Sequence, residues 1–257
     1  MTARSIDLNC DMGESYGPWV MGDDLNVLPH VTSANIACGF HGGDPAIARK
    51  TVAAALAQGV ALGAHPGLND LPGFGRRNIP ITPQEAYDIT VYQVGALAGV
   101  AASQGARLHH VKAHGALYNM AAKSAPLAEA IARAVRDVDA GLVFYGLAGS
   151  ALVRAAEGAG LTTASEVFAD RSYQADGTLT PRGQPGAMIE TLEASIAQVL
   201  RMVQEGKVRT ADGQDVAVRA DTLCIHGDQP GAVTFARGIR AALADAGIEI
   251  RTMQRQA

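Results

Sequence analysis

The sequence contains few cysteines, few aromatic residues and no excess of basic charge. Of its 257 residues 3 are cysteine, aromatic side chains make up 5%, and 21 basic against 25 acidic residues leave a net charge of -4. Because a nucleic-acid-binding surface needs clustered Lys and Arg, this balance argues against a nucleic-acid partner. Three widely separated cysteines without a Cys-x-x-Cys pair are typical of free thiols in a reducing compartment, so we expect a cytoplasmic protein.

Long apolar runs are also missing. The longest uninterrupted apolar stretch falls short of the ~20 residues that a membrane span requires, and no signal-peptide pattern follows Arg4. We therefore expect neither a secretory signal nor a membrane partner. What is abundant is Ala and Gly, with 29 glycines in a composition that is 48% hydrophobic. This composition is typical of a tightly packed α/β protein.

Short apolar runs alternate with longer Ala-rich helical patterns along the whole chain. The predicted strands are 6–10, 33–38, 60–64, 110–113, 142–147, 162–167 and 222–225, with a further one at 248–251. The predicted helices are 45–58, 83–102, 124–138, 150–159, 186–205 and 231–246. Such alternation predicts parallel strands joined by crossover helices, and seven or eight units indicate a distorted, TIM-like (β/α) barrel. We expect a single domain over residues 1–257, with a doubly wound open sheet as the alternative fold.

Polar residues gather where the predicted strands end. In the first strand, period-two alternation places Asp7, Asn9 and Asp11 on one face, with Glu14 just beyond the strand. Polar groups on one face of a buried strand destabilise the fold unless they find partners or a ligand. The carboxyl ends of barrel strands form the active-site face, so we interpret these residues as parts of a site, with a structural role as the alternative for Asp7.

The next two strands end in turns that carry histidines. His41 lies in the glycine-rich turn 38–45, where glycines let a ligand approach the backbone, although no P-loop Gly-Lys-Ser/Thr follows. His65 follows the third strand, and the long loop after it carries Arg76 and Arg77. These arginines could bind a carboxylate or phosphate, or be solvated surface charges. A loop of this length is typical of a lid or binding loop.

The fourth strand carries the densest polar pattern. Alternation sends His110, Lys112 and His114 to one side of it. A lysine inside a barrel needs an anion or a lowered pKa, which favours a functional role for Lys112 and His114. His109 and His110, at the start of the strand, are expected to be structural.

Two later strands add further polar residues. Glu166 and Arg171 lie at the end of the sixth strand, and His226 and Asp228 follow the seventh. The last two could form a His–carboxylate pair, in which the acid fixes the imidazole tautomer, or only a local hydrogen-bonded turn. Together, histidines, a lysine and carboxylates at the same end of successive strands indicate an acid–base or hydrolase-like site.

Five ordered segments resemble the LamB/YcsF family. They are Asp-Leu-Asn-Cys-Asp-Met-Gly-Glu from Asp7, Ala-Cys-Gly-Phe-His-Gly-Gly-Asp from Ala37, Gly-Ala-His-Pro from Gly63, Val-Lys-Ala-His-Gly-Ala-Leu-Tyr-Asn from Val111 and Cys-Ile-His-Gly-Asp from Cys224. The resemblance runs from Ile6 to about Thr252. It implies a distorted barrel related to glycoside hydrolases and polysaccharide deacetylases.

The resemblance also implies a reaction and partners. Members of this family are described as A subunits of a bacterial 5-oxoprolinase, which opens 5-oxo-L-proline (pyroglutamate) to L-glutamate with hydrolysis of ATP to ADP and phosphate. They act with two partner subunits, B and C. ATP is therefore expected as a co-substrate, although this sequence has no recognisable nucleotide-binding motif.

The chemistry of the reaction suggests roles for the polar residues. The residues expected to be catalytic are Asp11, Glu14, His65, Lys112, His114, Glu166 and His226. The residues expected to bind substrate are Asp7, Asn9, His41, Arg76, Arg171 and Asp228. Carboxylates and histidines would deprotonate water, and basic groups would neutralise phosphate or the substrate carboxylate. Alanine at Lys112 or His114 is expected to abolish glutamate formation while the fold is preserved.

Two other functions fit the same residues. A stand-alone metal-dependent amidase or deacetylase would hold a divalent ion with a shell drawn from Asp11, His41, His65, His114 and His226. No His-x-x-x-His helix or other tight ligand spacing supports this function, so no residue is assigned as a metal ligand. A non-catalytic subunit would bind 5-oxoproline and leave turnover to its partners.

Overall fold

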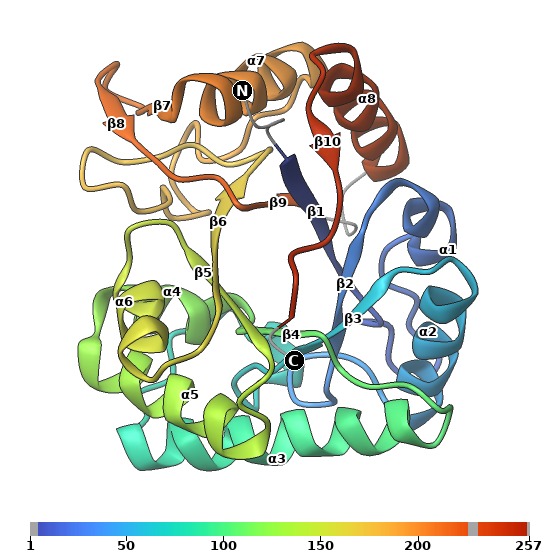
Figure 1. Ribbon diagram of the computed structural model, residues 1–257. Helices are drawn as coiled ribbons and strands as arrows, with labels where there is room; N and C mark the ends of the chain where they lie inside the picture. The colour runs from blue at the N-terminus through green and yellow to red at the C-terminus, as the bar shows by residue number, and fades with distance from the viewer. Residues whose placement is uncertain (1–4, 226–230, 256–257) are drawn as a thin grey trace.

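The fold is a closed barrel of parallel strands, described here from a computed structural model for residues 5–225 and 231–255 (Figure 1). The barrel strands are β1 (Ser5–Met12), β2 (Ser33–Ala37), β3 (Ala61–His65), β4 (His110–Lys112), β5 (Val143–Leu147), β6 (Thr163–Phe168) and β9 (Thr222–Ile225). They pair in chain order, and β9 pairs with β1, with Asp7 beside Thr222 and Cys10 beside Ile225. This pairing confirms the predicted barrel and excludes the open sheet. A short eighth strand, β10 (Glu249–Ile250), pairs with the start of β1.

Helices surround the barrel (Figure 1). They are α1 (Asp24–Val27), α2 (Pro45–Ala57), α3 (Pro83–Ala102), α4 (Gly115–Lys123), α5 (Ala125–Val138), α6 (Ala151–Gly158), α7 (Leu192–Glu205) and α8 (Ala232–Asp245). Helix α2 begins behind Asp44, whose side chain accepts from two backbone N–H groups, and α3 begins with a capping box between Thr82 and Glu85. Among the described residues, no helix combines the length and apolar character needed to cross a membrane.

Several features differ from the sequence-based expectation. Helices α1 and α4 were not predicted, and α7 begins at Leu192 and not at Gly186. The later start has a local cause, because Thr191 is the N-cap and its side chain accepts from the Ala194 N–H group. A hairpin of β7 (Lys207–Arg209) and β8 (Asp215–Ala217) was also not predicted.

The alternation of β1 separates its two kinds of side chain. Ile6, Leu8 and Cys10 belong to the hydrophobic core, with exposed fractions of 1% or less. Asn9 and Asp11 point into the barrel, where both contact the Lys112 ammonium group from β4. The core therefore lies between strands and helices, and the polar residues lie inside the barrel.

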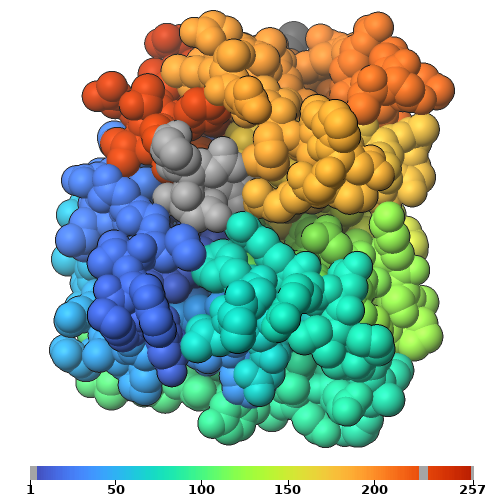
Figure 2. All heavy atoms as spheres, turned by 180° about the vertical axis from the view of Figure 1, so that it is seen from behind, coloured from blue at the N-terminus to red at the C-terminus, as the bar shows by residue number. Residues whose placement is uncertain are grey.

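The segments that follow the strands meet on one face of the molecule. Figure 2 shows this face, on which the blue N-terminal segment and the orange segment after β6 both lie beside the teal segment after β3. In a parallel barrel, this is the arrangement that builds a site from several loops.

Candidate active site

Lys112 lies at the centre of a buried ion-pair network. Its ammonium group is 2.9 Å from Asp11 Oδ1 and 2.8 Å from Glu166 Oε1, and it donates to Asn9 Oδ1 at 3.1 Å. Burial alone would lower the pKa of Lys112, but the charges of Asp11 and Glu166 raise it well above its usual value. Lys112 is therefore positively charged and is held between carboxylates from two strands.

Glu166 is fixed on both of its oxygens. One oxygen pairs with Lys112, and the other accepts a hydrogen bond of 2.6 Å from the hydroxyl of Tyr118 on α4. Burial, and then the charge of Glu166, raise the pKa of Tyr118 well above its usual value. The phenol thus keeps its proton and donates a hydrogen bond to the carboxylate.

A second layer of amide and imidazole groups holds Asp11. Asn35 donates to Asp11 Oδ1 at 2.8 Å and to Asn9 Oδ1 at 2.7 Å. His110 Nε2 donates to Asn35 Oδ1 at 2.7 Å, since an amide oxygen can only accept. His110 therefore has the structural role predicted for it, and Asn35 is a network residue that sequence reasoning did not assign.

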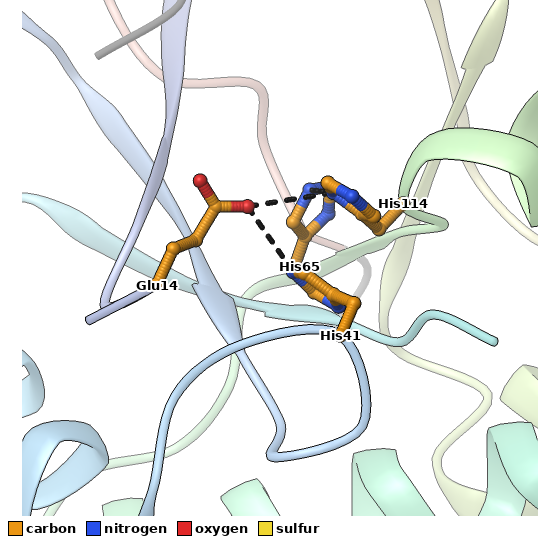
Figure 3. Close-up of side chains that lie close together, drawn as sticks. All are labelled: Glu14, His41, His65 and His114. Atoms are coloured by element: carbon orange, nitrogen blue, oxygen red, sulfur yellow. Dashed lines mark hydrogen bonds and ion pairs between the residues drawn. The ribbon is translucent and has the colours of Figure 1, made fainter. Parts of the chain in front are cut away.

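Glu14, His41, His65 and His114 form a compact cluster beside this network (Figure 3). Glu14 Oε1 is 3.1 Å from His41 Nε2 and 3.4 Å from His114 Nδ1. His114 Nδ1 is 3.0 Å from His65 Nε2. One ligand atom from each residue lies within 4.8 Å of all the others, so the cluster could hold a metal ion.

Close packing with two glycines keeps the histidine rings together. A Cβ atom at Gly75 would lie 2.6 Å from the His41 Cβ and 2.8 Å from the His114 Cδ2, and one at Gly67 would lie 2.6 Å from the His41 Nδ1. Burial lowers the pKa of His41 and of His114 well below the usual value, and neighbouring histidines lower it further. Both rings are therefore neutral at pH 7.

A polar cavity of about 440 Å³ borders the network and the cluster. Asp11, His65, Lys112 and His114 line it. The basic residues that also line it are Arg76, Arg171 and Arg182. Such a lining suits a small anionic ligand, with carboxylate and imidazole groups available for proton transfer.

A second cavity of about 380 Å³ also borders the histidine cluster. Glu14 and His41 line it together with the apolar side chains of Trp19, Leu71 and Phe74. Different members of the cluster therefore line the two cavities, His65 and His114 the first and Glu14 and His41 the second.

Two of the predicted site residues, Asp7 and Arg171, have other surroundings. Asp7 accepts hydrogen bonds from the hydroxyls of Thr32, Ser33 and Thr222 and is 1% exposed, as its structural alternative requires. Arg171 lines the polar cavity and donates to two backbone carbonyls, and burial lowers its pKa to about 10. His226 and Asp228 lie outside the described residues.

Tyr118 is a further network residue that sequence reasoning did not assign. It follows His114 by four residues, which is the spacing of one helical turn. Had α4 been predicted, this spacing would have placed Tyr118 on the same side as His114. The hydroxyl would then have been a candidate partner for a buried carboxylate.

Asp24 of α1 holds the backbone at the base of the cluster, because its side chain accepts from the Gly13 N–H group at 2.7 Å. Burial raises the pKa of Asp24 from 3.8 to about 6. Between these values the folded chain binds more protons than the unfolded chain, so stability falls as the pH rises from about 4 to about 6. The loss is on the order of 2 kcal/mol. Asp24→Asn keeps the acceptor without the charge and is expected to flatten this part of the profile.

Urea unfolding of the wild type and of the Asp24→Asn variant between pH 4 and pH 7 measures this effect. Asp88→Asn, at an exposed position of α3, serves as the control and should keep the wild-type slope. An Asp24→Asn variant with an unchanged slope would show that Asp24 does not titrate in this range.

Known proteins are similar to this chain over nearly its whole length. The family described as "LamB/YcsF family" matches residues 6–257. The A subunit of 5-oxoprolinase from Bordetella pertussis is 74% identical over 96% of this chain and 98% of its own length. The A subunit of 5-oxoprolinase from Bacillus subtilis is 59% identical over 98% of both chains.

A solved structure is similar over almost the same range. The crystal structure of the "Lactam Utilization Protein" from Thermus thermophilus superimposes with a TM-score of 0.91, at 48% sequence identity, over 97% of this chain and 100% of that one. Both the family match and the curated relatives cover nearly all of the sequence. The chain therefore belongs to the LamB/YcsF family.

Proposed function

We propose that this chain is the A subunit of a 5-oxoprolinase, and that with subunits B and C it opens 5-oxo-L-proline to L-glutamate at the expense of ATP. The single observation that carries the proposal is the polar cavity, where a buried ammonium group, guanidinium groups and a carboxylate–imidazole pair surround space for a small anion. The names of the curated relatives, which match over nearly the whole chain, support the same substrate.

ATP is needed because a five-membered lactam is a stable amide. Transfer of the γ-phosphoryl group to the lactam oxygen breaks a P–O bond of ATP and releases ADP. Water then adds to the activated carbon, the C–N bond breaks to leave an acyl phosphate, and a second water releases phosphate and glutamate. Each addition needs a base for the water proton and a positive charge near the departing phosphate.

The residues of this chain supply both requirements. Asp11 and His65 line the cavity with Asp11 Oδ2 3.3 Å from His65 Nε2, and the Asp11 carboxylate can take a proton from water. Arg76 is exposed at the cavity and is the group expected to bind the carboxylate of the substrate. Lys112 provides a fixed positive charge at the cavity wall.

The test is glutamate release from 5-oxoproline by this chain, alone and mixed with its two candidate partner subunits, with and without ATP. We expect ATP-dependent glutamate only in the complete mixture. Arg76→Met should raise the KM for 5-oxoproline about 10-fold or more, the loss expected for one charged hydrogen bond. Arg49→Met, at an exposed position of α2, should leave the KM unchanged.

The outcomes separate the alternatives. No glutamate from well-folded subunits would contradict the proposal. Glutamate from this chain alone without ATP would favour a stand-alone amidase. Turnover that tolerates substitutions at Asp11 and Lys112 would favour a non-catalytic, substrate-binding subunit.

A further inference from the structure

His65 is fixed in one tautomer by a backbone carbonyl. Its Nδ1 atom lies 2.7 Å from the carbonyl oxygen of Lys112, in a buried hydrogen bond. A carbonyl oxygen can only accept, so Nδ1 carries the proton. In the neutral ring, the Nε2 atom therefore presents a lone pair to the cluster.

His114 is fixed in the opposite tautomer by the same kind of bond. Its Nε2 atom lies 2.8 Å from the carbonyl oxygen of Phe74 and must donate to it. The Nδ1 atom then presents a lone pair to His65 Nε2, 3.0 Å away. Two lone pairs that face each other at this distance repel unless a cation lies between or beside them.

Two carboxylates lie next to these imidazole nitrogens and favour a cation between them. Glu14 Oε1 is 3.4 Å from His114 Nδ1, and Asp11 Oδ2 is 3.3 Å from His65 Nε2. One shared proton would satisfy only the pair of nitrogens. A divalent ion would satisfy the nitrogens and a carboxylate together, which is the chemistry of mixed His–carboxylate metal sites.

His41 does not fit as a direct ligand beside His114. The two rings are parallel within 2°, with centroids 3.6 Å apart, so an ion in the plane of one ring lies well outside the plane of the other. Among the described residues, the His41 Nδ1 atom has no hydrogen-bond partner, so this ring lacks the carbonyl anchor of the other two. Its Nε2 atom is 3.1 Å from Glu14 Oε1 and is placed to donate to that carboxylate.

We propose that His65 Nε2, His114 Nδ1 and the carboxylate of Glu14 bind one divalent transition-metal ion of the Zn²⁺, Mn²⁺ or Fe²⁺ class. Ligand atoms ~2.1 Å from one ion lie ~3.0 Å apart at a right angle and ~3.4 Å apart in a tetrahedron. The distances of 3.0 and 3.4 Å from His114 Nδ1 match these two values. The backbone carbonyls behind both imidazoles are the partners that orient metal-binding histidines.

The remaining coordination positions face the polar cavity, because His65 and His114 line it. An ion there would accept a water molecule or an oxygen atom of the substrate, and it would lower the pKa of that water. The three ligands are present whatever the substrate is. Metal binding and 5-oxoproline turnover can therefore succeed or fail separately.

The experiment uses the full-length chain, stripped with a chelator and returned to buffer. Titration with Zn²⁺ is followed by calorimetry, and titration with Co²⁺ is followed by its visible absorption. We expect one ion per chain. His65→Ala and His114→Ala should weaken binding at least about 100-fold, since outer-shell partners alone contribute 10–100-fold.

Three further variants separate the ligands from their neighbours. Glu14→Gln retains the size of the side chain, so the variant is expected to fold. It should weaken metal binding at least about 10-fold. His41→Gln keeps a donor for Glu14 and should keep the stoichiometry of one. His30→Gln, at a histidine that precedes β2 and is not part of the cluster, should bind as the wild type does.

Two results would overturn the site. The first is a wild-type chain that takes up no more Zn²⁺ than the folded His65→Ala and His114→Ala variants do. The second is a shared imidazole proton between His65 and His114, seen by ¹⁵N nuclear magnetic resonance in a chain that binds none of these ions. Circular dichroism of each variant establishes that it is folded before it is titrated.

Discussion

Replacing Lys112 by methionine is expected to lower the free energy of unfolding by about 3–5 kcal/mol, the cost of breaking a buried ion pair from one side. The ammonium group compensates Asp11 at 2.9 Å and Glu166 at 2.8 Å. Without it, Glu166 is left as a fully buried charge to which the Tyr118 hydroxyl still donates. Urea unfolding at pH 7 measures the loss.

Glutamate formation should also fall, because the variant lacks the positive charge at the cavity wall. In the complete three-subunit mixture, at a temperature where the variant is folded, Lys112→Met should reduce glutamate formation about 10²- to 10³-fold, as loss of one electrostatic group does. Adding Glu166→Gln removes an uncompensated charge and should recover part of the stability but not the activity. The burial of Lys112 thus revises the expectation that its removal preserves the fold.

The control is Lys50→Met, at an exposed position of α2, which should change stability by less than ~0.5 kcal/mol. A Lys112→Met chain as stable as the wild type would show that the carboxylates are protonated or hydrated in the folded state. It would therefore contradict the charged network described above.

Replacing Gly63 by alanine is expected to destabilise the fold by about 2–5 kcal/mol, although it adds a single methyl group. A Cβ atom at this position of β3 would overlap the His110 imidazole at Nε2. The imidazole would have to move, and its buried hydrogen bond to Asn35 Oδ1 would be lost. Because Asn35 also holds Asp11, the change should spread to the Lys112 network.

A double-mutant cycle distinguishes this steric cause from a general effect of alanine. His110→Ala removes the ring that the methyl group would strike, so the double variant should be more stable than the sum of the two single changes predicts, by at least ~1 kcal/mol. Gly95→Ala is the matched control, because a Cβ atom there meets nothing within 4 Å, and it should stabilise α3 by up to ~1 kcal/mol. Strict additivity of Gly63→Ala and His110→Ala would rule out the proposed clash.

The barrel and the location of the site could be predicted because both follow from local patterns. Alternation of strands and helices leaves few topologies, and parallel strands bring their carboxyl ends to one face. His65, Lys112 and His114 were therefore expected near one another before any pairing was known. Asp44 and the Thr82–Glu85 capping box fixed the starts of α2 and α3 in the same local way.

What could not be predicted depends on contacts across the barrel. The partners of Lys112 come from residues 101 positions earlier and 54 positions later in the chain, so spacing did not identify them. The sequence also suggested Asp11 as the carboxylate of a metal site, whereas the cluster contains Glu14. The position of Glu14 depends on the path of the chain after β1, which spacing alone does not give. The hairpin β7–β8 did carry a local sequence signal, because the turn-forming pair Asp212-Gly213 lies between Val208 and Val216. Each strand has three residues, which is too short for a clear alternating pattern.

The pairing of β9 with β1 has a consequence for how the protein is made. Asp7 and Asn9 both contact the hydroxyl of Thr222, which is synthesised more than 200 residues after them. Until then, the polar face of β1 lacks the hydroxyl and backbone partners that β9 supplies. A nascent chain that ends before Thr222 holds an open sheet with an unpaired edge, the kind of intermediate that chaperones protect. The order of the strands thus makes closure a late step of folding on the ribosome.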